Sequence, residues 1–260
     1  MKKIKQTISS LILNMFLACL FIVTPAQAQG VGPHYEDDWP IIAVTHPTGV
    51  IMLDQLEYTT NDGDESLEYE ISGWYGGDIN RVSLEIEGGQ SLDGSEQGEL
   101  ERLDLYYSRL IAPFWEVRGG FGMQSNYGTG EKDERGFAVF GLKGLAPYYF
   151  ETDANIRVSD DGDVSADIEF EYDMRITQRL ILQPQIETKV AFSSAEEFEQ
   201  GSGINNIKSA LRLRYEIRRE FAPYIGVSWD KKLGETADMV RDDGGAESNL
   251  SFLLGTRMWF

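Results

Sequence analysis

The stretch VSADIEFEYD at residues 164–173 decides the fold. Its apolar side chains alternate strictly with serine, aspartate and glutamate. Successive side chains of a β-strand point to opposite faces, so the stretch predicts a strand with one apolar and one acidic face. The same alternation runs through residues 150–158 and 207–216. About ten residues is the length at which a tilted strand crosses a bilayer.

Twelve segments of this kind follow one another along the chain. They lie at residues 50–60, 66–75, 79–89, 99–110, 113–123, 135–144, 148–158, 163–174, 179–191, 205–217, 221–231 and 249–260. An even number of antiparallel strands is the rule in bacterial outer-membrane barrels, and it returns the chain to the side where it began. The sequence therefore predicts an all-β fold, a transmembrane up-and-down barrel over residues 50–260 with both termini in the periplasm.

The predicted connections also alternate. Those after even-numbered segments are short, and three of these crossings carry an Ala-Pro-aromatic run, at residues 112–114, 146–148 and 222–224. Those after odd-numbered segments tend to be longer and rich in glycine and acids, as at residues 88–98, 124–134, 193–205 and 234–247. Short periplasmic turns and long outer loops are typical of outer-membrane barrels. The alternative is a soluble β-sandwich whose last strand happens to end in Phe260.

The two ends of the chain carry targeting signals. Three lysines, an apolar run and Ala26-Gln27-Ala28 predict a signal peptide over residues 1–28. Lipoprotein processing at Cys19 is the alternative, but Leu17 is bulky where a lipobox has a small residue. Residues 29–49, with three prolines and no strand pattern, are expected to form a periplasmic arm or partial plug. The final strand, apolar at every second position up to Phe260, resembles the recognition signal of the outer-membrane assembly machinery.

The charge of the chain narrows its partners. Asp and Glu total 43 against 23 Lys and Arg, which gives a net charge of −20. This balance argues against nucleic-acid binding and favours a surface that attracts cations. The only cysteine, Cys19, lies in the signal peptide, so the mature chain is expected to contain no disulfide and no thiolate metal ligand.

Catalysis has little support in the sequence. Neither histidine falls in a predicted strand or outer loop, because both lie in the arm. A Ser-His-Asp site in the barrel is therefore excluded, whereas a hydrolase built from carboxylates alone stays possible without a specific signature. We expect a protein that is not an enzyme.

The predicted inward face of the barrel is strongly charged. Its acids are Glu68, Glu70, Glu85, Glu87, Asp104, Glu151, Asp153, Asp167, Glu169, Glu171 and Glu187. Its bases are Arg118, Arg157, Lys189, Arg212, Arg214 and Arg257. One interpretation is a set of ion pairs that fills a narrow barrel. The other is a cation route lined with carboxylates.

Four residues are candidate metal ligands. His34 and His46 lie in the arm near acidic residues, and imidazole with carboxylate suits Cu(II) or Zn(II). Met52 and Met123 could offer thioethers to Cu(I). Two histidines in a polar arm are more often simply solvated, so this pattern alone does not decide for a metal.

Several long runs are similar to one known family. They are GWYGGDINR at 73–81, GLAPYYFE at 144–151, TQRLILQP at 177–184, LRLRYEIRREFAPYIGV at 211–227, KLGETAD at 232–238 and the Trp259-Phe260 ending. Together they resemble the copper resistance protein B family from about residue 50 to the end. The resemblance implies an outer-membrane barrel, in contact with outer-membrane lipid, that serves periplasmic copper tolerance. It also implies copper ions, as Cu(I) or Cu(II), as ligand and a periplasmic multicopper oxidase as a partner.

One departure from the family pattern matters for the copper site. Members often carry a long segment rich in methionine and histidine before the barrel, whereas here the arm is short, with two histidines and no methionine. Any copper site is therefore expected in the lumen or at His34 and His46. We expect a copper-resistance barrel that binds copper and assists its sequestration or efflux. The alternative is a structural or small-solute barrel without a metal role.

Overall fold

The computed structural model describes residues 47–61, 64–92, 98–127, 133–194, 200–242 and 244–260. The predicted signal peptide and most of the predicted arm, with His34 and His46, lie outside these residues, and both assignments stay predictions. Among the described residues, no helix is both long and apolar enough to cross a bilayer.

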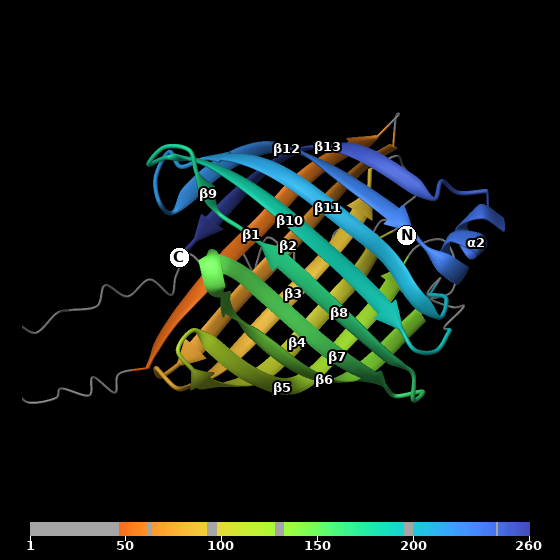
Figure 1. Ribbon diagram of the computed structural model, residues 1–260, viewed down its shortest axis with the longest axis horizontal. Helices are drawn as coiled ribbons and strands as arrows, with labels where there is room; N and C mark the ends of the chain where they lie inside the picture. The colour runs from red at the N-terminus through yellow and green to blue at the C-terminus, as the bar shows by residue number, and fades with distance from the viewer. Residues whose placement is uncertain (1–46, 62–63, 93–97, 128–132, 195–199, 243) are drawn as a thin grey trace, which may run out of the picture. The chain divides into compact units, whose positions relative to one another are not determined.

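The described part of the chain forms one antiparallel sheet with twelve long strands (Figure 1). They are β1 (Thr48–Asn61), β2 (Asp64–Gly76), β3 (Asn80–Ser91), β4 (Gly98–Ala112), β5 (Trp115–Tyr127), β6 (Asp133–Ala146), β7 (Phe150–Ser159), β8 (Val164–Glu171), β10 (Leu180–Ala191), β11 (Gly203–Tyr215), β12 (Phe221–Lys232) and β13 (Ser248–Trp259). Each coincides with one predicted segment. The predicted twelve-stranded barrel is confirmed.

The sheet closes on itself between its first and last strands. β1 pairs with β2 on one side and with β13 on the other, with Met52 opposite Trp259 and Thr60 opposite Phe252. Phe260 completes the seam, because its N–H donates to the Ile51 carbonyl over 2.9 Å. A sandwich would leave four edge strands, whereas the twelve long strands form a closed ladder, which excludes the β-sandwich.

The two ends of the barrel differ. Short turns join β2 to β3, β4 to β5 and β6 to β7, the last through the 3₁₀ turn η1 (Pro147–Tyr149). We call this end, where β1 also starts and β13 ends, the short-turn end. The opposite, long-loop end carries the connections from β10 to β11 and from β12 to β13. Two odd-numbered connections, at residues 62–63 and 160–163, are nevertheless short.

Two local features differ from the prediction. The segment predicted at 163–174 stops at Glu171 and resumes as the short strand β9 (Met174–Arg175). The break lies opposite Pro184, whose carbonyl accepts the Tyr172 N–H but which has no N–H to return a bond. In the last long loop the chain forms helix α2 (Gly234–Asp242), where an irregular glycine- and acid-rich loop was predicted.

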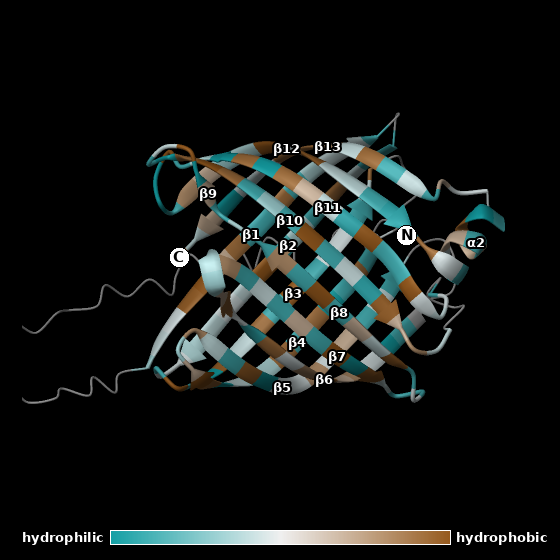
Figure 2. Ribbon diagram, in the orientation of Figure 1, coloured by the Kyte–Doolittle hydropathy of each residue, from teal (hydrophilic) through white to brown (hydrophobic). Residues whose placement is uncertain are grey.

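Side chains sort by face along every long strand. Figure 2 shows hydrophobic and hydrophilic residues alternating along the strands. The outer face exposes large apolar side chains, and at the short-turn end it exposes the aromatic residues Tyr75, Phe114, Tyr148, Tyr149, Trp259 and Phe260. An apolar band bordered by aromatic rings is the outer surface of a membrane barrel. The interior is polar, and Glu57, Asp104, Ser108 and Arg212 are almost fully buried.

This arrangement predicts that a charged residue on the outer face destabilises the barrel more, the closer it lies to the centre of the bilayer. Phe140, in the middle of β6, is 62% exposed, and Ile111, at the short-turn end of β4, is 59% exposed. Phe140→Arg should destabilise the barrel by about 2–4 kcal/mol and Ile111→Arg by about 0–1 kcal/mol, because only the first places a guanidinium near the bilayer centre. Urea unfolding in lipid vesicles measures both. Equal losses would contradict a lipid-facing band.

Candidate functional site

The charged residues predicted to face inward do line the lumen, and most of the central ones are paired. Arg118, from β5, is 2% exposed. Its guanidinium bonds Glu85 of β3 at 2.8 Å and contacts Asp153 of β7, and its Nε donates to Asn155 at 3.1 Å. It also stacks on Tyr106, 4.4 Å from the ring centre. Arg118 thus joins β3, β5 and β7 through all three nitrogens of its guanidinium.

A second central arginine is held just as firmly. Arg157 of β7 donates to Asp104 at 2.6 and 3.1 Å and to Asp167 at 2.9 Å. The Tyr106 hydroxyl donates to the same Asp104 carboxylate at 2.6 Å. The two oxygens of this buried carboxylate are therefore satisfied by three hydrogen bonds from other side chains. The centre of the lumen is therefore a hydrogen-bonded network.

A third network links the first and last parts of the chain inside the lumen. Arg212 of β11 donates from Nε to Glu57 of β1 at 2.5 Å and from Nη2 to Gln55 at 3.0 Å. Its remaining amino group contacts Gln185 of β10. Glu57 was not among the predicted inward acids because a register shift between Leu53 and Leu56 breaks the simple alternation of β1.

Arg102 of β4 is different from these three arginines. Its side chain is 12% exposed and lies 3.6–3.9 Å from carboxylates of Glu85, Glu87, Asp104 and Asp167. Within the described residues its guanidinium makes no hydrogen bond that meets normal distance and angle limits. The sequence analysis did not include Arg102 among the inward-facing bases, although it lies two residues from Asp104 and therefore on the same face of β4. Four surrounding carboxylates hold it by charge, but no directional bond fixes its position.

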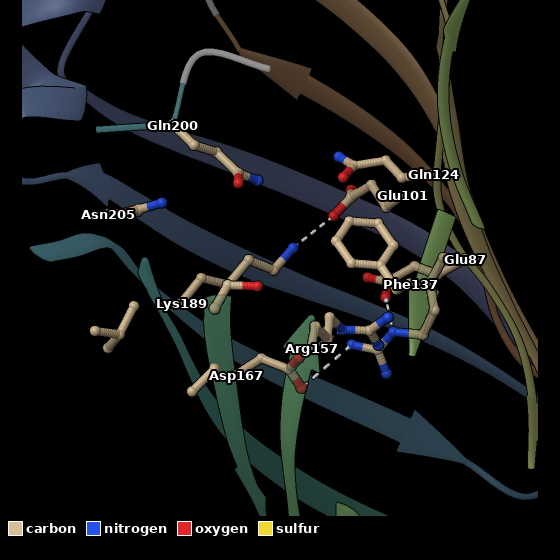
Figure 3. Close-up of a pocket in the computed structure, with 13 residues that line it drawn as sticks. Glu87, Glu101, Gln124, Phe137, Arg157, Asp167, Lys189, Gln200 and Asn205 are labelled. Carbon is tan, nitrogen blue, oxygen red and sulfur yellow. Dashed lines mark hydrogen bonds and ion pairs between the residues drawn. The ribbon is translucent and has the colours of Figure 1, made fainter. Parts of the chain in front are cut away.

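Two cavities meet at Arg102. The larger, of about 310 Å³, lies toward the short-turn end and is lined by Met52, Lys143, Arg214, Arg257 and seven carboxylates, those of Asp54, Glu70, Glu85, Glu151, Asp153, Glu169 and Glu171. The smaller, of about 60 Å³, lies toward the long-loop end, and Figure 3 shows its residues. There Lys189 bonds Glu101 at 2.7 Å. Arg102 is the one described residue that lines both cavities, so its side chain lies between them.

The larger cavity contains more acid than base can neutralise. Glu151 and Glu171 lie directly opposite each other on β7 and β8, and Asp153 and Glu169 form the next opposite pair. Among the described residues, Glu70, Glu151, Glu169 and Glu171 have no cationic group within 4 Å. Glu169 and Glu171 only accept from the amides of Gln185 and Gln183. Like charges directly opposite in a sheet repel, and a bound cation would relieve that repulsion.

At the long-loop end, helix α2 holds the neighbouring loop. The Glu235 carboxylate accepts from the Ser202 N–H at 2.9 Å and from its hydroxyl at 2.8 Å. These two donors lower the pKa of Glu235. The Thr236 hydroxyl accepts from the Gly201 N–H at 2.9 Å. The contacts fix a loop that contains Gln200, which lines the smaller cavity together with Asn205 of β11.

The structure separates the two methionines predicted as metal ligands. Met52 lines the larger cavity. Met123 of β5 is 37% exposed. It lies two residues from Phe121, which is on the outer face, so the Met123 side chain also points away from the lumen. His34 and His46 lie outside the described residues. Within the described part, no three His, Cys, Asp or Glu side chains are close enough together to form a ready metal site.

The surplus carboxylate oxygens of the larger cavity attract cations. Oxygen donors on separate strands, with one thioether beside them, can bind a metal ion in passage without enclosing it. No histidine follows residue 46, so the barrel offers no imidazole for acid–base catalysis.

Comparison with known proteins points to one family. The family model for copper resistance protein B precursor matches residues 48–260. The chain is 36% identical over 211 residues to copper resistance protein B of Escherichia coli, covering 81% of this chain and 69% of that protein. It is 33% identical over 209 residues to the copper resistance protein B homolog of Pseudomonas syringae pv. tomato, covering 80% and 69%.

Solved barrels are similar at a greater distance. The KdgM porin matches with a TM-score of 0.49 and 10% identity, over 82% of this chain and 99% of that one. The NanC porin matches with a TM-score of 0.48 and 13% identity, over 81% and 99%.

The position of Arg102 predicts a change in conductance. Arg102→Ala should join the two cavities, raise the single-channel conductance in planar bilayers and increase cation selectivity, because the space between them then loses a bulky side chain and one positive charge beside four carboxylates. Arg241→Ala, in α2 outside the lumen, is the matched control. A folded Arg102→Ala barrel with unchanged conductance would show that Arg102 does not separate the cavities.

The Arg212 network predicts a large stability effect. Arg212→Ala leaves Glu57, which is 1% exposed, as a buried charge without its partner, and should destabilise the barrel by about 3–5 kcal/mol. Arg212→Met combined with Glu57→Leu removes both charges and should recover much of that loss. Urea unfolding followed by tryptophan fluorescence measures both. Equal losses in the two variants would rule out the unpaired charge as the cause.

Proposed function

Because this chain belongs to the copper resistance protein B family, we propose that its outer-membrane barrel binds copper weakly in the lumen and assists copper removal from the periplasm. Family membership supports the role in copper resistance. The route through the lumen is inferred from the larger cavity, where Glu70, Glu151, Glu169 and Glu171 have no cationic partner among the described residues. That surplus of carboxylates is the observation that carries the proposal.

The ligands follow from the chemistry of the cavity wall. Carboxylate oxygens suit Cu(II), and the Met52 thioether, which lines the same cavity, suits Cu(I). Glu151 and Glu171 are the first candidates, because they face each other across one strand pair. Met123 is on the outer face and has no part in this site. Arg102 lies between the cavity and the long-loop end, where it limits the passage of ions.

The orientation completes the proposed route. We place the short-turn end in the periplasm, together with both chain ends of the barrel, as in other outer-membrane barrels. The acidic cavity then lies on the side from which copper arrives. His34 and His46, which precede β1 in the sequence, are proposed to collect copper there. A periplasmic multicopper oxidase is the proposed source of oxidised copper. The chain itself is proposed to have no enzymatic activity.

The proposal predicts that removing two lumen carboxylates weakens copper binding. Glu151→Gln combined with Glu171→Gln should reduce copper bound by the full chain in detergent, and should lower copper tolerance when the variant complements a deletion strain. Titration with Cu(II), and with Cu(I) under reductant, measures binding. The same titrations of Met52→Leu test whether the Met52 thioether contributes to Cu(I) binding. A His34→Ala, His46→Ala variant tests the arm.

The matched control is Asp160→Asn with Asp161→Asn. It removes the same charge from the exposed turn after β7, at the long-loop end. Heat-modifiable gel migration confirms that each barrel is folded. Unchanged copper tolerance on deletion, together with no copper binding by the purified protein, would refute the proposal and favour a structural or small-solute barrel. That alternative predicts conductance that copper does not alter.

A further inference from the structure

Two neighbouring turns at the short-turn end border an open cavity that the proposed copper function does not use. One turn joins β8 to β10 and contains β9, and the other joins β11 to β12. They lie side by side because β10 and β11 are paired up to Leu180 and Tyr215, and the Glu216 N–H donates to the Arg179 carbonyl at 2.8 Å. The cavity between them is about 700 Å³.

Four arginines line this cavity, namely Arg175, Arg179, Arg218 and Arg219. All four are exposed, and within the described residues none has a carboxylate within 4 Å. Glu216 is the only acidic residue among the described lining residues. Three other turns at this end, at residues 77–79, 113–114 and 147–149, contain no arginine. On a chain with a net charge of −20, this is a local positive site.

Apolar residues of the same two turns place the site at the membrane surface. Ile176 and Ile217 line the cavity and are 55% and 50% exposed. The indole of Trp259, in the aromatic border of the barrel, donates to the Arg219 carbonyl at 2.6 Å. Because aromatic borders lie at headgroup depth, the arginines lie at the level of the lipid phosphates.

We propose that this cavity binds the phosphate of an anionic phospholipid headgroup from the leaflet at the short-turn end. The guanidinium groups match phosphate oxygens as planar, two-pronged donors. Ile176 and Ile217 contact the first carbons of the acyl chains. An acidic protein surface would satisfy the arginines but would leave the two isoleucines exposed, which favours the lipid.

The test compares lipid binding by the full chain and a charge-neutral variant. Wild type is equilibrated with equal amounts of phosphatidylglycerol and phosphatidylcholine, and native mass spectrometry counts the retained lipids. The expected result is a preference for phosphatidylglycerol that falls by about fivefold for each arginine removed in Arg179→Gln with Arg218→Gln. Arg179→Lys with Arg218→Lys should retain most of the preference, and Arg241→Gln, at the long-loop end, should retain all of it.

Several outcomes would overturn the proposal. One is that wild type binds the two lipids with equal affinity. Another is that the folded glutamine variant keeps the full preference for phosphatidylglycerol. A third is that inorganic phosphate binds as tightly as the lipid. Arginine-dependent binding of polyglutamate without a lipid preference would assign the site to an acidic protein. If the glutamine variant does not fold, the wild-type preference is measured against salt, and a preference that does not fall with ionic strength refutes a headgroup contact.

Discussion

The seam between β1 and β13 is the contact on which the rest of the structure depends. A backbone N–H or C=O facing hydrocarbon without a partner is strongly unfavourable, so a sheet can cross a membrane only if it has no free edge. Here the edges meet through the register from Met52 to Thr60 and through two hydrogen bonds between Ile51 and Phe260, at 2.9 and 3.2 Å. Closure also fixes which face of every strand is inside. The alternation of apolar and polar residues in the sequence then places the apolar side chains outside and the charged ones in the lumen.

Closing a narrow barrel around charged side chains forces most of them to pair. Arg118, Arg157 and Arg212 each use several donors on carboxylates or amides from other strands. These networks are structural, and they answer the question of what fills the lumen. Pairing is incomplete where the geometry of neighbouring strands brings acid opposite acid, as at Glu151 and Glu171. Ion pairing therefore describes the centre of the lumen, whereas the surplus of acid, where we propose the cation route, lies toward the short-turn end.

Much of this architecture could be predicted from the sequence, because alternation is a local signal and twelve strands repeat it. The failures have non-local causes. The break between β8 and β9 depends on Pro184 in the facing strand, which no pattern within 163–174 reveals. Glu57 was not predicted to face the lumen, because a bulge between Leu53 and Leu56 changes which residues of β1 point inward. Helix α2 is anchored by Ser202 and Gly201 from another loop. Whether a lumen charge is paired depends on which strands meet across the barrel, so the surplus in the larger cavity could not be predicted.

The location of the family match bears on where the copper function lies. The match begins at residue 48, the first residue of β1, and extends to Phe260, whereas the predicted arm lies almost entirely before it. The features that this chain shares with its copper-resistance relatives are therefore features of the barrel. The carboxylates that line the larger cavity all lie within the matched range, and four of them have no cationic partner among the described residues. On the proposed function, the carboxylates of the barrel form the copper path, and the two arm histidines serve only to raise the local copper concentration.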